Sequence, residues 1–181
     1  YIWFGCIAIV VIVIVAMLIY YFLFNKDETR ISQGIDSTKT ASIECTADKI
    51  EDEFFVEENA DSVKNTIKMM FVSDKFDRLF YNYEGKYGSD AAAETANAVL
   101  HGRYNKYMAS KSVDPDSLDP SFSNSGNTVK IVLNADSNDL SNANVNLFFL
   151  SMDEFQHIRS YKIDDWMKLY KGKGFTCEKH D

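Results

Sequence analysis

The sequence predicts an α+β fold: a mostly antiparallel sheet with one long helix packed on it, preceded by an N-terminal transmembrane helix. Three observations predict this arrangement. Residues 1–24 form an apolar run, residues 62–87 alternate between apolar and polar positions, and residues 90–111 carry an apolar stripe at helical spacing. Strands and a long helix in one small domain pack as two layers around a common core.

The first 24 residues, YIWFGCIAIVVIVIVAMLIYYFLF, contain no charged residue, no proline and one glycine. As a helix they extend roughly 36 Å, more than a hydrocarbon core of about 30 Å. A cleavable signal peptide has a shorter apolar core and a small-residue cleavage site, whereas NKDETR follows here. We therefore predict a transmembrane helix at residues 1–24 in the lipid bilayer, a polar tether at residues 25–40 and an extracytoplasmic α+β domain at residues 41–181.

All charged residues lie after this apolar run, where 19 Lys+Arg and 27 Asp+Glu give a net charge of −8. An acidic balance argues against nucleic acid as a partner and against flat docking on an anionic membrane surface. The charge is also what keeps a domain of this size in solution.

Cys45 and Cys177 are the two cysteines outside the apolar run, one near each end of the expected domain. An even count at these positions predicts a disulfide that ties the C-terminus to the first strand, and hence a domain outside the cytoplasm. The alternative is two reduced thiols in a cytosolic domain, an orientation that Lys26 and Arg30 favour. The chain has no N-x-S/T sequon, which favours a bacterial envelope over a eukaryotic ectodomain. We therefore predict a single-pass protein of the cell membrane whose folded domain lies outside the cytoplasm.

Period-2 patterns predict the strands. The clearest are SVKNTIKMMFV and FDRLFYNYEGKY, which form an antiparallel hairpin around a three-residue loop at Ser73-Asp74-Lys75. Further strands are expected at residues 41–47, 128–136 and 174–177.

Ser89 is a suitable N-cap for a helix from residue 90 to about 111. Its apolar stripe is expected to consist of Ala92, Ala96, Val99, Leu100, Tyr104, Tyr107 and Met108. Ser151 and Glu154 have the spacing of a capping box and begin a short helix to about residue 159. Another helix starts near Asp164 and ends at Gly172 or Gly174, residues 112–127 are expected to form a loop, and the structures of residues 48–61 and 137–150 are left open.

No motif for catalysis stands out. His101, His157 and His180 lack ligand spacing, and no nucleophile elbow, phosphate-binding loop or dinucleotide fingerprint occurs. Asp114 and Asp116 have the spacing of positions 1 and 3 of a calcium loop. However, Asp119 stands where such a loop needs glycine, Leu118 sits at position 5 and Ser125 replaces the closing glutamate, so a solvated turn is expected. We therefore predict no catalytic residue, no cofactor and no metal, and a protein that is not an enzyme.

Two resemblances bear on function. The early cysteine in IECTADKIEDEFF, the strand pair IKMMFVSDKFDRLFYNYEGKY, the helix AAAETANAVLHGRYNKY, the strand TVKIVLNAD and the closing GFTC resemble the small uncharacterised bacterial lipoproteins of the YehR type over about residues 41–178. This resemblance implies a place outside the cell membrane and no defined chemistry. We expect a binding or accessory module of the bacterial cell envelope with an envelope protein as a possible partner.

The alternative is a pilin-like subunit of a filament or secretion assembly, because the chain opens with an aromatic residue and a long apolar run. Type IV pilins carry Glu at the fifth position, where this chain has Gly5, and NKDETRISQGID lacks the apolar stripe of a pilin stalk.

Overall fold

The computed structural model describes residues 40–50, 54–55 and 59–180. The strands of this part are β1 (Thr40–Ala47), β2 (Ala60–Val72), β3 (Lys75–Tyr87), β4 (Ser121–Ser125), β5 (Thr128–Asp136) and β6 (Thr176–His180). Its α-helices are α3 (Asp90–Ser110), α4 (Met152–His157) and α5 (Ile163–Gly172), and its 3-10 helices are η1 (Pro115–Leu118), η2 (Val145–Phe148) and η3 (Ile158–Ser160).

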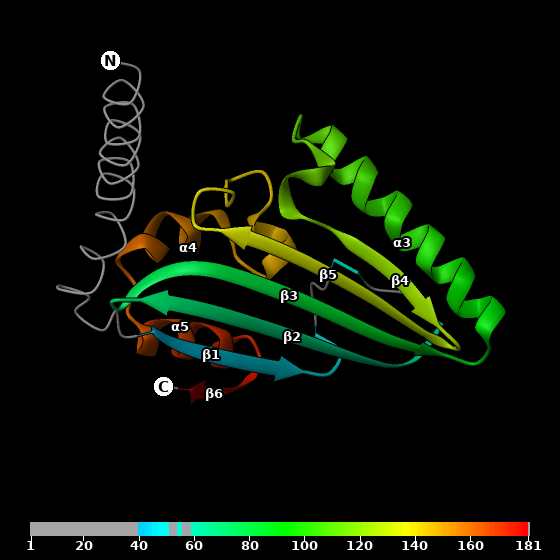
Figure 1. The fold of residues 1–181 in the computed structure, drawn as a ribbon, viewed down its shortest axis with the longest axis horizontal. Helices are drawn as coiled ribbons and strands as arrows, with labels where there is room; N and C mark the ends of the chain where they lie inside the picture. The colour runs from blue at the N-terminus through cyan, green and yellow to red at the C-terminus, as the bar shows by residue number, and fades with distance from the viewer. Residues whose placement is uncertain (1–39, 51–53, 56–58, 181) are drawn as a thin grey trace, which may run out of the picture. The chain divides into compact units, whose positions relative to one another are not determined.

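The strands form a single sheet in the order β4-β5-β3-β2-β1-β6, and every neighbouring pair is antiparallel (Figure 1). The expected hairpin is its centre, but its loop is shorter than expected. Ser73 and Asp74 alone make the turn, with φ of 52° and 62°. Two successive residues at positive φ define the turn whose twist matches that of the flanking strands.

One face of the sheet forms the core. Cys177, Cys45, Ile67, Tyr81 and Leu133 lie opposite one another across five adjacent strands, and all five are buried. Because alternate residues of a strand point to the same face, this row repeats every second position and gives the sheet one continuous apolar side.

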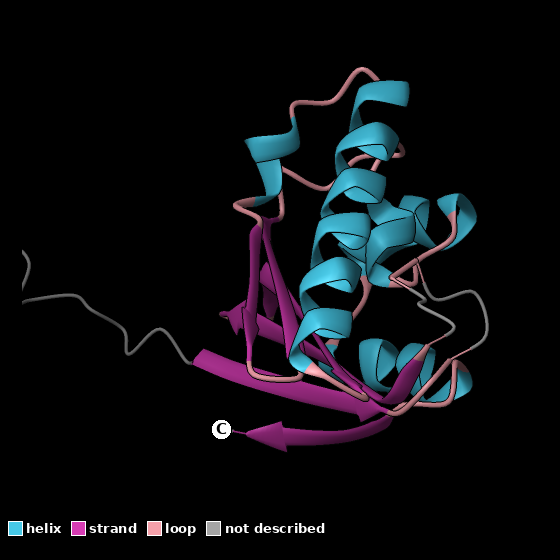
Figure 2. Cartoon of the chain, turned by 90° about the vertical axis from the view of Figure 1, so that its right-hand side faces the viewer, coloured by secondary structure: helices cyan, strands magenta, loops and turns pink. Residues whose placement is uncertain are grey.

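In the described part of the chain, the helices lie on that side of the sheet (Figure 2). α3 packs over β3, β5 and β4, and its N-cap Ser89 accepts a hydrogen bond from the Ala92 backbone N–H at 3.2 Å, as expected. The expected stripe was slightly misplaced: Ala93 is buried where Ala92 was expected, and Val99 is 45% exposed. The buried positions Ala93, Ala96, Leu100, Tyr104 and Met108 follow the helical period from a different starting residue.

The expectation of one long helix on the sheet was incomplete. α5 packs against β1 and β6 and buries Ile163, Trp166 and Tyr170, so each half of the sheet has its own helix. The capping box at the start of α4 is present as expected.

The loop expected at residues 112–127 contains a strand. β4 has the sequence SFSNS, and only Phe122 is partly buried in it. Of the stretches left open, residues 51–53 and 56–58 lie outside the described residues, and residues 145–148 form η2. Phe55 is fully buried against Tyr81, Tyr83 and Tyr104.

The fold class predicted from the sequence is wrong in its membrane-spanning part. Among the described residues no helix has both the length and the apolar character needed to cross a bilayer. The run at residues 1–24, to which that helix was assigned, lies outside the described residues. What is observed is an α+β fold with an antiparallel sheet covered on one face by helices.

Candidate functional site

A partly open pocket of about 770 Å³ lies where the chain after β1, the segment between η2 and α4, and the turn between α5 and β6 meet. Its lining includes Lys49, Ile50, Phe149, Leu150, Ser151 and Lys173. Ligand pockets for small molecules commonly have volumes of about 300–1,000 Å³. The three segments are far apart in the sequence, so only the folded chain forms the pocket.

The sheet register explains how Lys49 and Lys173 reach the same pocket. Cys45 lies directly opposite Cys177, and Thr46 lies opposite Thr176. In an antiparallel pair, each step forward on one strand matches a step back on the other. Lys49 follows Cys45 by as many residues as Lys173 precedes Cys177. The two lysines therefore belong to the same end of the β1–β6 pair.

The disulfide between Cys45 and Cys177 is present in the structure, with an Sγ–Sγ distance of 2.03 Å and a Cα–Cα distance of 4.0 Å. It joins residues separated by 132 positions in the sequence. Both side chains belong to the buried core. The bridge fixes β6, an edge strand, to β1, and with it the segments that carry the two lysines.

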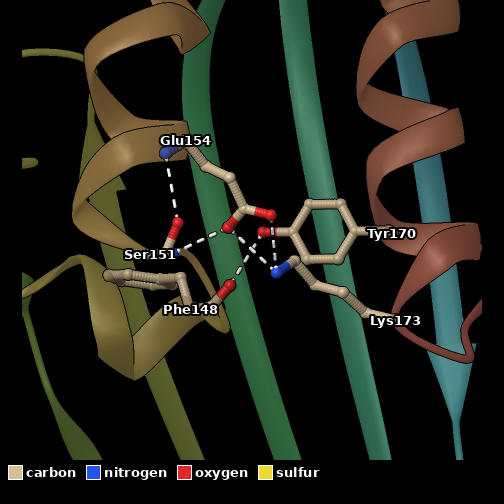
Figure 3. Close-up of polar contacts among 5 residues, drawn as sticks. All are labelled: Phe148, Ser151, Glu154, Tyr170 and Lys173. Carbon is tan, nitrogen blue, oxygen red and sulfur yellow. Dashed lines mark hydrogen bonds and ion pairs between the residues drawn. The ribbon is translucent and has the colours of Figure 1, made fainter.

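The start of α4 contributes Ser151 to the lining of the pocket. Figure 3 shows the contacts between Ser151 and Glu154. The Ser151 hydroxyl accepts a hydrogen bond from the Glu154 backbone N–H at 3.1 Å, and the Ser151 backbone N–H donates to Glu154 Oε2 at 2.7 Å. Phe149 ends η2 at φ 60°, and this turn leads the chain into the cap. Ser151 is thereby held at the pocket with its hydroxyl proton available to a further acceptor.

Glu154 and Lys173 connect two walls of the pocket. Lys173 Nζ lies 2.8 Å from Glu154 Oε1 and 2.9 Å from Oε2, and each side chain is about a quarter exposed, at 24% for Glu154 and 25% for Lys173. Burial alone would raise the pKa of Glu154, but the hydrogen bonds from Lys173 and Ser151 outweigh it and lower that pKa. Glu154 is therefore a carboxylate at neutral pH.

Tyr170 makes the second connection between these walls. Its hydroxyl donates to the Phe148 carbonyl oxygen at 2.9 Å, and the side chain is fully buried (Figure 3). Burial, together with the nearby Glu154 carboxylate, raises the pKa of Tyr170. The hydroxyl stays protonated and keeps α5 at a fixed distance from η2.

The polar residues singled out in the sequence lie elsewhere and apart from one another. His101 stacks on Phe122 with ring centroids 4.5 Å apart, and His157 Nδ1 lies 2.9 Å from the Asp153 carbonyl oxygen. The Asp114 side chain accepts from the Asp116 backbone N–H at the start of η1, which is a turn role. In the part of the chain that the structure describes, no three His, Cys, Asp or Glu side chains are grouped to hold a metal ion.

The uncovered face of the sheet is the other extended surface. Several of its charges lie opposite an opposite charge, with Lys68 opposite Glu44 and Arg78 opposite Asp136, whereas Glu44 also lies opposite Glu178. Lys130 Nζ lies 3.4 Å from Glu84 Oε2 on the same face. Alternating charges and hydroxyl groups are typical of an antiparallel sheet face in contact with water, so this surface indicates no ligand class.

Sequence reasoning found Ser151 and Glu154 through the capping-box spacing but missed Lys49 and Lys173. No local pattern marks either lysine. The signal that could have found them is their equal offset from the two cysteines, once the cysteines are paired in antiparallel strands.

Comparison with known proteins gave no match to this chain among family models, curated proteins or solved structures. The resemblances to YehR-type lipoproteins and to pilins therefore stay predictions. The apolar run on which the pilin resemblance depends lies outside the described residues.

Proposed function

We propose that residues 40–180 form an extracytoplasmic binding module of the bacterial cell envelope, with the pocket between Lys49, Ser151 and Lys173 as its ligand site. The disulfide supports the location, because such bonds persist in oxidising compartments and are rare in the cytoplasm. It also fixes the strands that lead to the pocket. The bilayer contact expected of residues 1–24 is not part of this proposal.

The single observation that carries the binding role is a pocket whose walls are held together before any ligand arrives. The Glu154–Lys173 pair, the Tyr170–Phe148 hydrogen bond and the disulfide each join segments distant in the sequence. Pre-formed pockets bind small molecules with little ordering of the protein.

Binding suits this pocket better than catalysis. A general base needs a pKa near the working pH, but the pKa of Glu154 is lowered and its oxygens already accept hydrogen bonds from Ser151 and Lys173. The Tyr170 proton is held by burial and by the Phe148 carbonyl oxygen. These groups are fixed in structural roles and can position a ligand without exchanging protons with it.

Two glycines allow a direct test in the full-length oxidised chain. A Cβ added at Gly172, which lines the pocket, or at Gly102, on the exposed side of α3, meets no atom within 4 Å. Small molecules of under about 500 Da would be screened by ligand-observed NMR against the wild type, Gly172→Trp and Gly102→Trp. We expect ligands that bind the wild type and Gly102→Trp but not Gly172→Trp. Ligands that bind all three equally, or the absence of any ligand, would contradict the proposal.

A further inference from the structure

We infer that the pocket takes a small organic anion with an apolar arm, its anionic head near Lys49, Lys173 and Ser151. This inference rests on the proposed function and names the ligand class of the same site. It depends on three features of the lining: the charge balance, the hydrogen-bond donors that are not yet used, and the position of the apolar side chains.

Among the described lining residues of the pocket, the charge is opposite in sign to that of the chain. The whole chain has a net charge of −8, whereas Lys49 and Lys173 line the pocket and Glu154 is the carboxylate paired with Lys173. Lys49 is exposed and forms no ion pair with any other described residue. Among the described residues, one positive charge is therefore left without a partner at the pocket, where it attracts an anion.

Hydrogen-bond donors are also available there. An ammonium group has three N–H donors, and Lys173 directs its ammonium to the two oxygens of Glu154, which leaves a third. The Ser151 hydroxyl accepts from the Glu154 backbone N–H and keeps its own proton to donate. The Lys49 ammonium adds a third side chain with donors to the lining of the same pocket.

A cationic ligand is disfavoured by the same contacts. Glu154 already accepts hydrogen bonds from the Ser151 backbone N–H and from Lys173. A cation would have to displace Lys173 from this carboxylate and would lie near two ammonium groups. Like charges brought together in this way oppose binding.

The remaining lining gives the ligand its second feature. Ile50, Phe149 and Leu150 line the pocket beside the polar groups, and Phe149 is itself packed edge-on against Tyr81 and Phe175. An apolar arm of the ligand would bury its surface against these side chains, at about 25 cal/mol for each Å² removed from water.

Three probes that differ only in their head group test the inference: 3-phenylpropionate, 3-phenylpropanol and 3-phenylpropylamine. Binding to the full-length oxidised chain would be measured by NMR titration. A partly exposed charge pair contributes up to about 1 kcal/mol. We therefore expect 3-phenylpropionate to bind up to about fivefold more tightly than 3-phenylpropanol. The amine should bind most weakly.

Variants separate the charge from the pocket. Lys49→Met keeps an apolar stem and should remove the preference for 3-phenylpropionate over 3-phenylpropanol. Lys106→Met, on the exposed side of α3, should leave the binding of both probes unchanged. Equal binding of the three probes, or an unchanged preference in Lys49→Met, would overturn the inference and leave the proposed pocket intact. Binding of all probes that is unaffected by Gly172→Trp would instead place the site elsewhere and overturn both.

Discussion

Lys173 Nζ lies within 3 Å of both carboxylate oxygens of Glu154, at 2.8 and 2.9 Å, and so joins the turn after α5 to α4. Both side chains are about three-quarters buried, at 25% and 24% exposure, whereas the Lys130–Glu84 pair on the open face is 54% and 35% exposed. Ion pairs gain strength as water is excluded from them. The two pairs offer a matched comparison within one chain.

Lys173→Met should lower the free energy of unfolding by about 1 kcal/mol, because it leaves a partly buried carboxylate without its cation. Lys130→Met should have a smaller effect, within about 0.5 kcal/mol. Urea unfolding followed by circular dichroism measures both. Equal effects of the two variants would show that the Glu154–Lys173 pair does not hold the pocket walls together.

At acid pH, protonation of Glu154 should lower the free energy of unfolding. Its pKa in the folded chain is below the ordinary value of 4.5, so the unfolded chain binds the proton more readily. This contribution to stability is complete above pH 4.5 and is lost as the pH falls through the lowered folded value. Glu154→Gln should make the free energy of unfolding less dependent on pH below 4.5, as measured by urea titrations at pH 3 to 6. An unchanged pH dependence in this variant would count against the ionised pair.

The β2–β3 turn does not have the residues most favoured for its geometry. Ser73 and Asp74 both adopt positive φ, a region in which Asn and Gly are favoured. The double substitution Ser73→Asn with Asp74→Gly should therefore raise the free energy of unfolding by roughly 0.4–1 kcal/mol. The midpoint of urea unfolding measures this change, with Ser62→Asn within β2 as a control that should bring no gain. A loss of stability in the double variant would contradict the turn geometry.

Elements with a strong local pattern were the predictable part of this fold. β2, β3 and β5 show clear alternation because one face is buried and the other is open to water. β4 was missed because SFSNS is an edge strand with one apolar side chain, so hydrogen bonding to β5 defines it more than burial does. α3 was found, but its alanine-rich start let Ala92 be chosen over Ala93 as the buried residue.

Only the capping box of the candidate site could be predicted from the sequence. The Ser151–Glu154 capping box depends on residues three apart, which a sequence pattern can show. The pairing of Glu154 with Lys173 depends on tertiary packing, and the position of Lys49 and Lys173 on the same pocket depends on the strand register. Neither relationship leaves a periodic signal in the sequence.

Removal of the disulfide should weaken the fold substantially. The bond closes a loop between residues 132 positions apart, and removal of a native disulfide from a small domain typically costs roughly 2–5 kcal/mol of stability. The Cys45→Ala, Cys177→Ala double variant should unfold at correspondingly lower urea concentration, and added reductant should not change it further. A double variant as stable as the oxidised wild type would mean that β6 is held by its other contacts alone.

The most direct test of the account is the state of these two cysteines in intact bacterial cells. In a Cys6→Ala background, intact cells would be quenched in acid and the chain unfolded in denaturant before a maleimide is applied, because Cys45 and Cys177 are buried in the folded chain. The reaction would be run with and without prior reduction on the otherwise wild-type chain and on Cys45→Ser and Cys177→Ser variants, in which the partner thiol is left single. The account predicts no labelling without reductant, labelling after reductant, and labelling of each single variant without it. Labelling of the otherwise wild-type chain without reductant would show that the two thiols are reduced in the cell, as expected of a cytoplasmic domain, and would contradict the proposed extracytoplasmic function.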